Sequence, residues 1–407
     1  MRRENNIIKL DKDDVKKIQR RQYLEKKQKV TFKNYLKGIK LTKNGILTII
    51  IIALGGLFYY LINNYHRIGL VINRNITAED AVVIETLYTD NIVTAYKDKV
   101  LVFEKGVLTA YDTNGVQNWS KKLEEIFTPD INVAGKYIQI VNKDTGYIYV
   151  LDNQYEVCRI KIQGNILSSS INKDGTSVIE YSTSGLKTVL GVYNKNGKEK
   201  YSLKLDNNTV SSYCLSDNSR YLAYGYADIS GISVVTKIDV IDMNKLGQKD
   251  YKFNTIIEKN NELVHKIYWD KNELNAMLNN TIIKYNANRD KKDWLEIGDL
   301  NAINLDINDE KIAFISAQGD KANYILSIAN YKGKVKSNKV IEEAPKYFMY
   351  QDGLVFVCYQ KAIKVFNTYG VNVKNYESNT TITKPIVFND GKNVAFSVSN
   401  RITIFEI

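Results

Sequence analysis

Two hydrophobic patterns divide the chain at about residue 80. From Gly45 to Ile62, eighteen consecutive residues carry no charge and most are apolar. As a helix rising ~1.5 Å per residue, this run would be roughly 27 Å long, close to the ~30 Å hydrocarbon core of a bilayer. From residue 81 onward, short runs rich in Val, Ile, Tyr and Phe alternate with Asn, Asp and Gly, which predicts strands joined by hairpins.

The flanks of the apolar run favour a membrane span over a buried helix. Basic residues up to Lys43 precede the run, and Tyr59, Tyr60 and Tyr65 at its far end are typical of an interfacial aromatic belt. The charged region before the run is too long for a signal peptide, and no A-x-A cleavage site follows. We therefore predict a cytoplasmic tail over 1–44, a transmembrane helix over 45–63 and a linker over 64–80, with the remainder outside the cell.

The net charge of +12 is concentrated in the tail. Residues 1–44 contain 15 basic and five acidic residues, whereas residues 45–407 contain 42 basic and 40 acidic residues. The large part of the chain is therefore nearly neutral, and nothing in its charge indicates a nucleic-acid partner.

The tail also contains one amphipathic segment just before the predicted span. In a helix, Phe32, Tyr35, Leu36 and Ile39 would share one face, with lysines beside it. Two interpretations stay open, and a third, a cytoplasmic docking tail for a partner, has no distinguishing motif. The segment either lies on the anionic inner leaflet of the membrane, or it is part of a solvated basic tail that only fixes the topology.

One element recurs in the second part of the chain: an apolar strand, an Asp, Asn or Gly turn, and a second apolar strand. Eight copies are centred on Asp98, Gly135, Asp174, Asp217, Asp270, Asp309, Asp352 and Asp390. Their spacings lie between 37 and 53 residues. A period near 40 with about four strands per unit predicts an all-β fold, a β-propeller, because a single four-stranded blade buries its faces only against neighbouring blades. The copies predict eight blades, with seven as the alternative.

The last copy stops at Ile407 after its third strand. A propeller ring that stays open would expose an unpaired strand edge. The segment Ala81–Leu87 precedes the first copy and has no other assignment. We therefore predict that it supplies the fourth strand of the last blade and closes the domain, which spans residues 81–407.

The stretch from Gly106 to Leu123 resembles a known repeat. In quinoprotein-like propellers a Gly opens the third strand, an Ala-x-Asp follows, a Gly turns the chain, and a Trp on the fourth strand packs against the next blade. Gly106, Ala110, Asp112, Gly115 and Trp119 fit this pattern. The pattern is eroded in other units. The chain therefore resembles a membrane-anchored member of the quinoprotein-like propeller superfamily.

The resemblance does not extend to redox chemistry. The quinone-dependent enzymes of this superfamily use an adjacent Cys-Cys disulfide above pyrroloquinoline quinone, a calcium ion and an Asp base. Here Cys158, Cys214 and Cys358 fall on three different units, and the only histidines are His66 and His265. We therefore predict no cofactor, no metal ligands, no catalytic residues and no dehydrogenase activity.

Three further kinds of residue have both a functional and a structural interpretation. His265, predicted in the first strand of the fifth unit, would line the central channel, where a satisfied polar residue is a more common role than a catalyst. The recurrent turn aspartates are interpreted as hairpin residues that bond their own backbone. The tryptophans, Trp119, Trp269 and Trp294, are interpreted as packing between blades.

The fourth unit is the irregular one, with a spacing of 53 residues. Its second hairpin, around Ala227–Val235, and the passage to the fifth unit both look lengthened. Long loops on a rigid scaffold often carry binding sites, whereas a tolerated insertion is the simpler alternative. No binding residues are assigned here.

Together these observations predict a bacterial cell-envelope protein whose extracytoplasmic propeller is a non-catalytic docking scaffold for another envelope protein. A sensor that binds a wall-derived or small ligand is the first alternative. A lyase or hydrolase that uses channel residues is the second, because propeller enzymes exist and carboxylates alone can suffice.

Overall fold

The computed structural model describes residues 51–52, 54–57, 74–75, 81–88, 91–123, 126, 129–205, 208–229, 234–246, 254–260, 262–270, 273–278, 281–287, 291–296, 301–308, 311–318, 323–330, 335–341, 343–351, 353–382, 385–388, 393–398 and 400–406. The chain divides into two compact units, Met1–Ile68 and Gly69–Ile407.

In the first unit only a short piece of helix is described, at residues 51–52 and 54–57, and its apolar side chains are exposed. Within the described residues, no helix has the length and apolar character that a bilayer crossing requires. The predicted tail and most of the predicted span lie outside the described residues, so both stay predictions.

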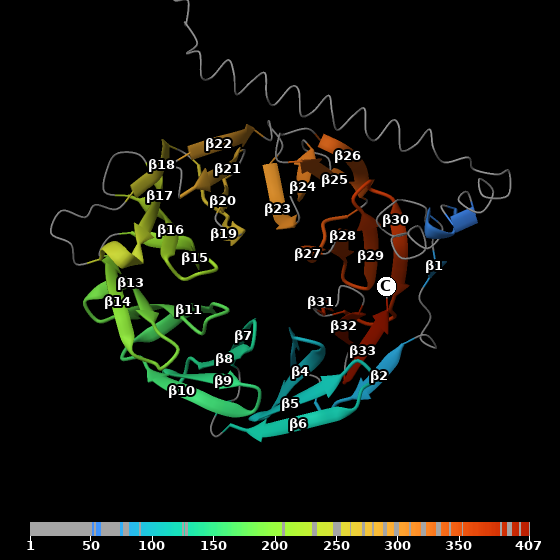
Figure 1. The fold of residues 1–407 in the computed structure, drawn as a ribbon, viewed down its shortest axis with the longest axis horizontal. Coiled ribbons are helices and arrows are strands. Elements are labelled where there is room, and N and C mark those ends of the chain that lie inside the picture. Colours follow the sequence, from blue (N-terminus) through green and yellow to red (C-terminus); the bar gives the residue numbers. More distant parts are fainter. Residues whose placement is uncertain are drawn as a thin grey trace, which may run out of the picture. The chain divides into compact units, whose positions relative to one another are not determined.

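The second unit is a ring of eight antiparallel sheets (Figure 1). In six of the eight sheets the first strand along the chain lies innermost and the fourth lies at the rim, and in the last two sheets a strand from the start of the domain is added at the outer edge. The prediction of an eight-bladed β-propeller is confirmed, and the seven-bladed alternative is wrong.

The first four blades are contiguous in sequence. Blade 1 contains β3 (Ile92–Tyr96), β4 (Lys99–Glu104), β5 (Val107–Asp112) and β6 (Gln117–Lys122). Blade 2 contains β7 (Asp130–Ala134), β8 (Tyr137–Asn142), β9 (Tyr147–Asp152) and β10 (Tyr155–Lys161). Blade 3 contains β11 (Asn165–Ile171), β12 (Ser177–Thr183), β13 (Leu186–Tyr193) and β14 (Glu199–Leu205). Blade 4 contains β15 (Thr209–Leu215), β16 (Tyr221–Asp228), β17 (Val235–Asp242) and β18 (Asn254–Asn260).

The remaining blades lead back to the start of the ring. Blade 5 contains β19 (Lys266–Asp270), β20 (Glu273–Met277), β21 (Thr281–Asn286) and β22 (Lys291–Glu296). Blade 6 contains β23 (Asn301–Asn308), β24 (Lys311–Gln318), β25 (Asn323–Asn330) and β26 (Val335–Ile341). Blade 7 contains β27 (Tyr347–Gln351), β28 (Leu354–Cys358), β29 (Ala362–Asn367) and β30 (Asn372–Glu377). Blade 8 contains β31 (Ile386–Val387), β32 (Asn393–Val398), β33 (Arg401–Glu406) and β2 (Val82–Glu85).

Blade 8 closes the ring in the predicted way. β2 pairs antiparallel with β33, and the Thr86 N–H donates to the Asn400 carbonyl at 2.8 Å. The predicted closing segment Ala81–Leu87 is confirmed as the fourth strand. A further strand, β1 (Arg74–Asn75), lies in the predicted linker and pairs parallel with β30 at the rim of blade 7.

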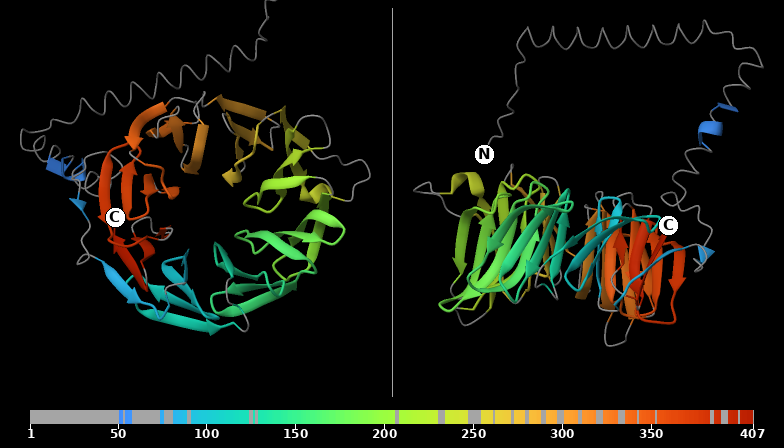
Figure 2. Two further views of the ribbon diagram at one scale, coloured as in Figure 1. Left: turned by 180° about the vertical axis from the view of Figure 1, so that it is seen from behind. Right: turned by 90° about the horizontal axis from the view of Figure 1, so that it is seen from below.

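The strand direction gives the ring two distinct faces (Figure 2). Because neighbouring strands are antiparallel, the hairpins between strands 1 and 2 and between strands 3 and 4 lie on one face, here called the turn face. The hairpins between strands 2 and 3 and the passages between blades lie on the opposite face, here called the connection face.

The burial of each strand follows its place in the blade. Second strands contact neighbours on both sides, so β8 and β28 are buried along their whole length. Rim strands contact a neighbour on one side only, and β10 is mostly exposed. The sequence matches this gradient, with continuous apolar runs inside and charged residues at the rim.

The tryptophan of the quinoprotein-like repeat packs where the resemblance implies. Trp119 on β6 lies against a cluster that contains Phe103 and Leu108 of blade 1 and Ile138 and Ile140 of blade 2. Adjacent blades therefore share one apolar core at this joint, as predicted for Trp119.

The turn of this repeat recurs in units where the sequence pattern looked eroded. In blade 1 the Asp112 Oδ1 accepts from the N–H groups of Asn114 and Val116, and Gly115 adopts a positive φ of 78°. The same arrangement starts from Asn194 in blade 3 and from Asn367 in blade 7, with Gly197 and Gly370 at a φ of 78° and 75°. An Asn side-chain oxygen accepts the same two bonds as an Asp oxygen, so the turn survives the substitution.

Candidate functional site

Blade 4 contains most of the additional chain, as its spacing predicted, but not all of it lies where expected. The β16–β17 connection has six residues (229–234), which is longer than the second hairpins of most other blades. The passage to blade 5 has only five residues (261–265) and is not lengthened, so that part of the prediction is wrong. The longest addition is the β17–β18 connection, eleven residues (243–253) that begin with the 3-10 helix η2 (Met243–Lys245).

On the connection face, blade 4 exposes three apolar side chains. Ile229 and Val234 are the first and last residues of the β16–β17 connection and are 56% and 40% exposed. Leu263, in the passage to blade 5, is 51% exposed, whereas the next residue, Val264, is buried in the core between blades 4 and 5. We call Ile229, Val234 and Leu263 the connection-face patch.

The patch stands on a fixed base. The buried Thr236 hydroxyl donates to the Glu262 carbonyl and ties the passage to β17. Lys237 forms an ion pair with Asp228 at 3.1 Å, and Lys259 forms one with Glu262 at 3.1 Å. These contacts hold the backbone on both sides of the exposed side chains, which lowers the entropy that binding would cost.

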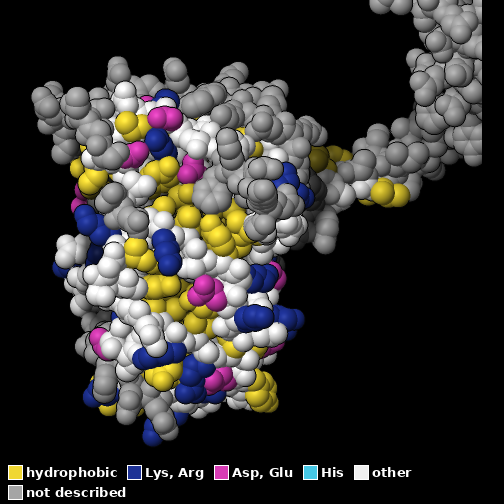
Figure 3. All heavy atoms as spheres, turned by 90° about the vertical axis from the view of Figure 1, so that its left-hand side faces the viewer, with side chains coloured by type: hydrophobic (Ala, Val, Ile, Leu, Met, Phe, Trp, Pro, Cys, Tyr) yellow, Lys and Arg dark blue, Asp and Glu magenta, His cyan; other side chains and the backbone are white. Residues whose placement is uncertain are grey.

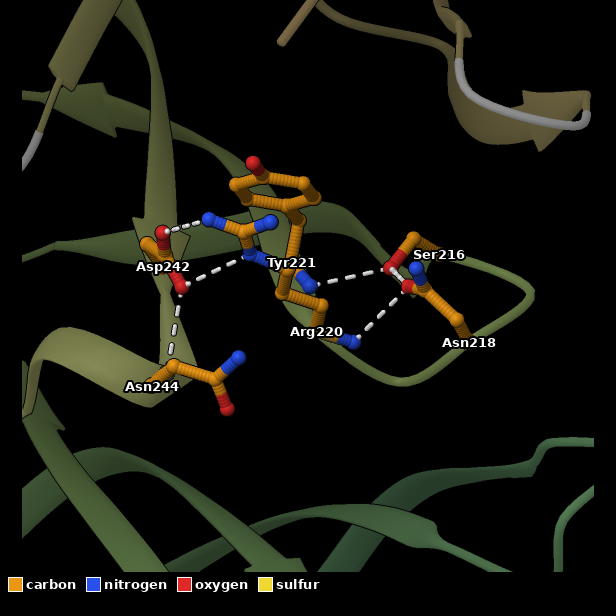
Figure 4. A network of polar contacts seen from close by, with 6 residues as sticks. All are labelled: Ser216, Asn218, Arg220, Tyr221, Asp242 and Asn244. Atoms are coloured by element: carbon orange, nitrogen blue, oxygen red, sulfur yellow. Dashed lines mark hydrogen bonds and ion pairs between the residues drawn. The ribbon is translucent and has the colours of Figure 1, made fainter. Parts of the chain in front are cut away.

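The turn face of blade 4 contains a polar network (Figure 4). The Arg220 guanidinium donates from Nε and Nη2 to the two carboxylate oxygens of Asp242, at 3.3 and 2.9 Å. The Asp242 Oδ1 also accepts from the Asn244 N–H at the start of η2. The hydrogen bond from Arg220 holds the pKa of the Asp242 carboxyl below its ordinary range.

An aromatic stack continues this network into the core. The Arg220 guanidinium lies 4.9 Å from the centre of the Tyr221 ring, and that ring stacks on Trp269 of blade 5 with centres 5.7 Å apart. Trp269 is only 8% exposed. Its predicted role in packing between blades is confirmed, and the stack fixes the position from which the η2 connection departs.

A second polar cluster joins blades 3 and 4. The Ser168 hydroxyl donates to Glu180 at 2.6 Å and lies 2.7 Å from the Tyr213 hydroxyl. Burial raises the pKa of the Glu180 carboxyl, against the opposing effect of the Ser168 hydrogen bond. Burial likewise raises the pKa of Tyr213. Sequence reasoning did not find this cluster, because its members come from three strands.

The other predicted positions are placed as follows. His265 lies immediately before β19 rather than inside it, is exposed, and donates its backbone N–H to the Met277 carbonyl at 2.9 Å. The cysteines are free and lie on three different blades, at Cys158, Cys214 and Cys358. For Trp294 the structure gives the backbone position on β22, paired with Ile283, and its packing role stays a prediction.

Charged residues of both signs occur on the side of the ring that contains blade 4. Figure 3 shows the side of the ring around blades 3 and 4, where Lys and Arg are interspersed with Asp and Glu. Of the side chains that the structure places, no three His, Cys, Asp or Glu are grouped as a metal site would require.

Comparison with known proteins agrees with this fold. Residues 73–407 match a family of unknown function (DUF5711). The chain belongs to this family. No curated protein matches it by sequence.

Two solved structures have a similar fold. The crystal structure of BamB from Moraxella catarrhalis has a TM-score of 0.54 and 14% sequence identity, and covers 80% of this chain and 98% of that chain. The crystal structure of Saccharomyces cerevisiae Sqt1 has a TM-score of 0.57 and 10% identity, and covers 79% of this chain and 97% of that chain. At these identities the likeness shows the propeller fold alone.

Proposed function

We propose that this protein is a non-catalytic docking scaffold whose propeller binds a protein partner through the connection-face patch of blade 4. The observation that carries the proposal is the exposure of Ile229, Val234 and Leu263 on a base fixed by hydrogen bonds and ion pairs. A rigid surface with exposed apolar anchors is the kind of site at which a few residues supply most of the binding energy.

We further propose that residues 45–63 anchor the propeller outside the cell membrane of a bacterium. The support is the uncharged Gly45–Ile62 run and the basic excess of residues 1–44. Confinement to one membrane raises the effective concentration of a partner in the same plane, so that weak contacts become useful.

Site-specific crosslinking in the native membrane tests the docking site. A photoreactive amino acid at Leu263 should give an adduct with one partner protein, whereas the same group at Val340, a 65% exposed residue on the rim strand of blade 6, should not. The double variant Ile229→Ser, Val234→Ser should weaken the adduct, because each buried aliphatic anchor contributes about 1.5–3 kcal/mol. Equal adducts at both positions would contradict the assignment of the patch.

Protease treatment of intact, wall-stripped cells tests the localisation. The propeller should be digested and the tail of residues 1–44 should be spared. Protection of the propeller would overturn the proposed topology.

An exchange of residues 1–63 for an unrelated anchor of the same orientation distinguishes the docking scaffold from the sensor. A sensor that signals through its tail would lose function, and a docking scaffold would keep it.

A further inference from the structure

The turns between the third and fourth strands present different types of side chain around the ring. Blades 1, 3 and 7 share the Asx–Gly turn, and in each the residue after the Gly donates its N–H to the Asx side chain. These residues are Val116, Lys198 and Val371. They occupy the same structural position on the turn face, and all three are exposed. Two blades therefore present an apolar side chain where a third presents a charged one.

Exposed apolar side chains occur near this position in five consecutive blades. From blade 6 through blades 7, 8 and 1 to blade 2, exposed apolar side chains lie at or beside the start of the fourth strand, with exposures between 41% and 69%. They are Val335, Tyr369, Val371, Val83, Val116 and Tyr155, here called the apolar arc. In blades 3 and 4 the corresponding exposed residues are polar, such as Lys198, Glu199 and Asn254.

The chain enters the propeller at this arc. β1 pairs with the rim strand β30 of blade 7, and Arg74 lies opposite Lys374. Because β1 is parallel to a fourth strand, it runs from the turn face toward the connection face, and Arg74 is its end nearer the turn face. Ten residues (64–73) separate β1 from the predicted span, and a fully extended chain of that length reaches at most about 35 Å. A bilayer would therefore be within reach of the arc.

The geometry points to the apolar arc as a seat on the phospholipid bilayer, with the headgroup and upper acyl region as its occupant. This inference rests on the proposed anchoring. Tyrosine prefers the membrane interface because its ring is apolar and its hydroxyl is polar, and valines on the same face add apolar area. The connection-face patch lies on the opposite face of the propeller and stays free for a partner.

Tryptophan quenching in the full chain tests the seat. The chain is reconstituted in phosphatidylcholine vesicles whose acyl chains carry bromine, a quencher of tryptophan emission. Tyr369→Trp and Asn196→Trp form a matched pair, because both residues hold the second position after the Asx of the same turn. With the emission of the parent chain subtracted, the tryptophan at position 369 should be quenched and blue-shifted, and the one at position 196 should not.

A second substitution keeps the test independent of folding. Val371→Lys should preserve the fold, because Lys198 occupies the equivalent turn in blade 3. Combined with Tyr369→Trp, it should reduce the quenching at position 369. Flotation of the vesicles separates the two proposals. If the chain does not float with the vesicles, the anchoring and the seat both fail. If it floats and Tyr369→Trp is not quenched, or is quenched no more than Asn196→Trp, only the seat is overturned.

Discussion

Blades 8 and 4 have the same four-stranded plan and use it differently. Blade 8 is assembled from residues at the two ends of the domain, and its contacts join Arg401 to Glu85 across 316 positions in sequence. Its innermost strand has two residues and β2 has four. Blade 4 is contiguous in sequence, and its strands have seven or eight residues. It has the longest connection between second and third strands and the longest connection between third and fourth strands in the ring. The ring therefore closes through the blade with the shortest strands. Blade 4, which has longer strands and takes no part in closure, is free to carry additional surface.

The first prediction removes the closing strand of blade 8. A chain that begins at residue 90 lacks β2, so Ile402 and Ile404 of β33 keep their partners on β32 but lose those on β2, and Ile84 is lost from the core. It should not fold, whereas a chain that begins at residue 78 should. Thermal unfolding followed by circular dichroism measures the difference. Equal midpoints for the two chains would show that β2 does not close the ring.

The second prediction concerns the joint between blades 4 and 5. Trp269→Ala removes a buried ring that stacks on Tyr221 and should destabilise the domain by about 3–5 kcal/mol. Trp119→Ala, at a joint where the indole is only partly buried, should cost less. Urea unfolding of both variants measures the costs, and the reverse order would contradict the packing described here.

The third prediction concerns the ion pair on the turn face of blade 4. Asp242→Asn should destabilise the domain by roughly 1 kcal/mol at neutral pH, because the Arg220 side chain is half exposed and partly screened. The pKa of Asp242 is lowered in the folded state, so its stabilising effect is present above the ordinary pKa of a carboxyl and is lost as the pH falls through the folded pKa. The difference between parent and variant should therefore vanish in acid.

The fourth prediction concerns a carboxyl whose pKa is shifted in the opposite direction to that of Asp242. Burial raises the pKa of Glu180, so the charged form is disfavoured and its contribution to stability is lost as the pH rises through the folded pKa. Glu180→Gln removes that charge and should stabilise the domain at neutral pH, by less than about 1 kcal/mol. In acid, below the ordinary pKa of a glutamate, the two chains should be equally stable. Loss of biological function in this variant, with the fold intact, would favour the enzyme hypothesis.

The smallest effect on stability is expected at the β16–β17 connection. A chain shortened within residues 229–234 should have a free energy of unfolding within about 0.5 kcal/mol of that of the parent, because no described core residue lies in that segment. Its partner capture should nevertheless fall, as measured by crosslinking from position 263. A large loss of stability would instead make the connection part of the fold.

The repeat was predictable because it rests on local patterns. Apolar alternation and turn residues recur in every unit, and the missing fourth strand of the last copy required Ala81–Leu87. The blade count and the closing strand were therefore both predicted. The transmembrane helix over 45–63 has comparable sequence support and remains a prediction.

What the sequence did not show depends on position in the ring. The contact between Ser168 and Tyr213 joins residues 45 positions apart on different blades. The η2 connection was missed because its turn signals resemble those of a strand boundary. Val116 and Val371 look like ordinary strand residues, and only the turns that they share with Lys198 reveal that they face outward.

The pairing of β2 with β33 also constrains the order of events during synthesis. β2 leaves the ribosome early, and its partner follows 316 residues later, which at about 5–20 residues per second is roughly 15–60 s. Throughout that interval Val82 and Ile84 have no strand to pair with, and the ring stays open while the blades in between are completed. The supply of chaperones that cover this apolar strand should therefore set the yield of closed propellers, independently of the stability of the finished domain.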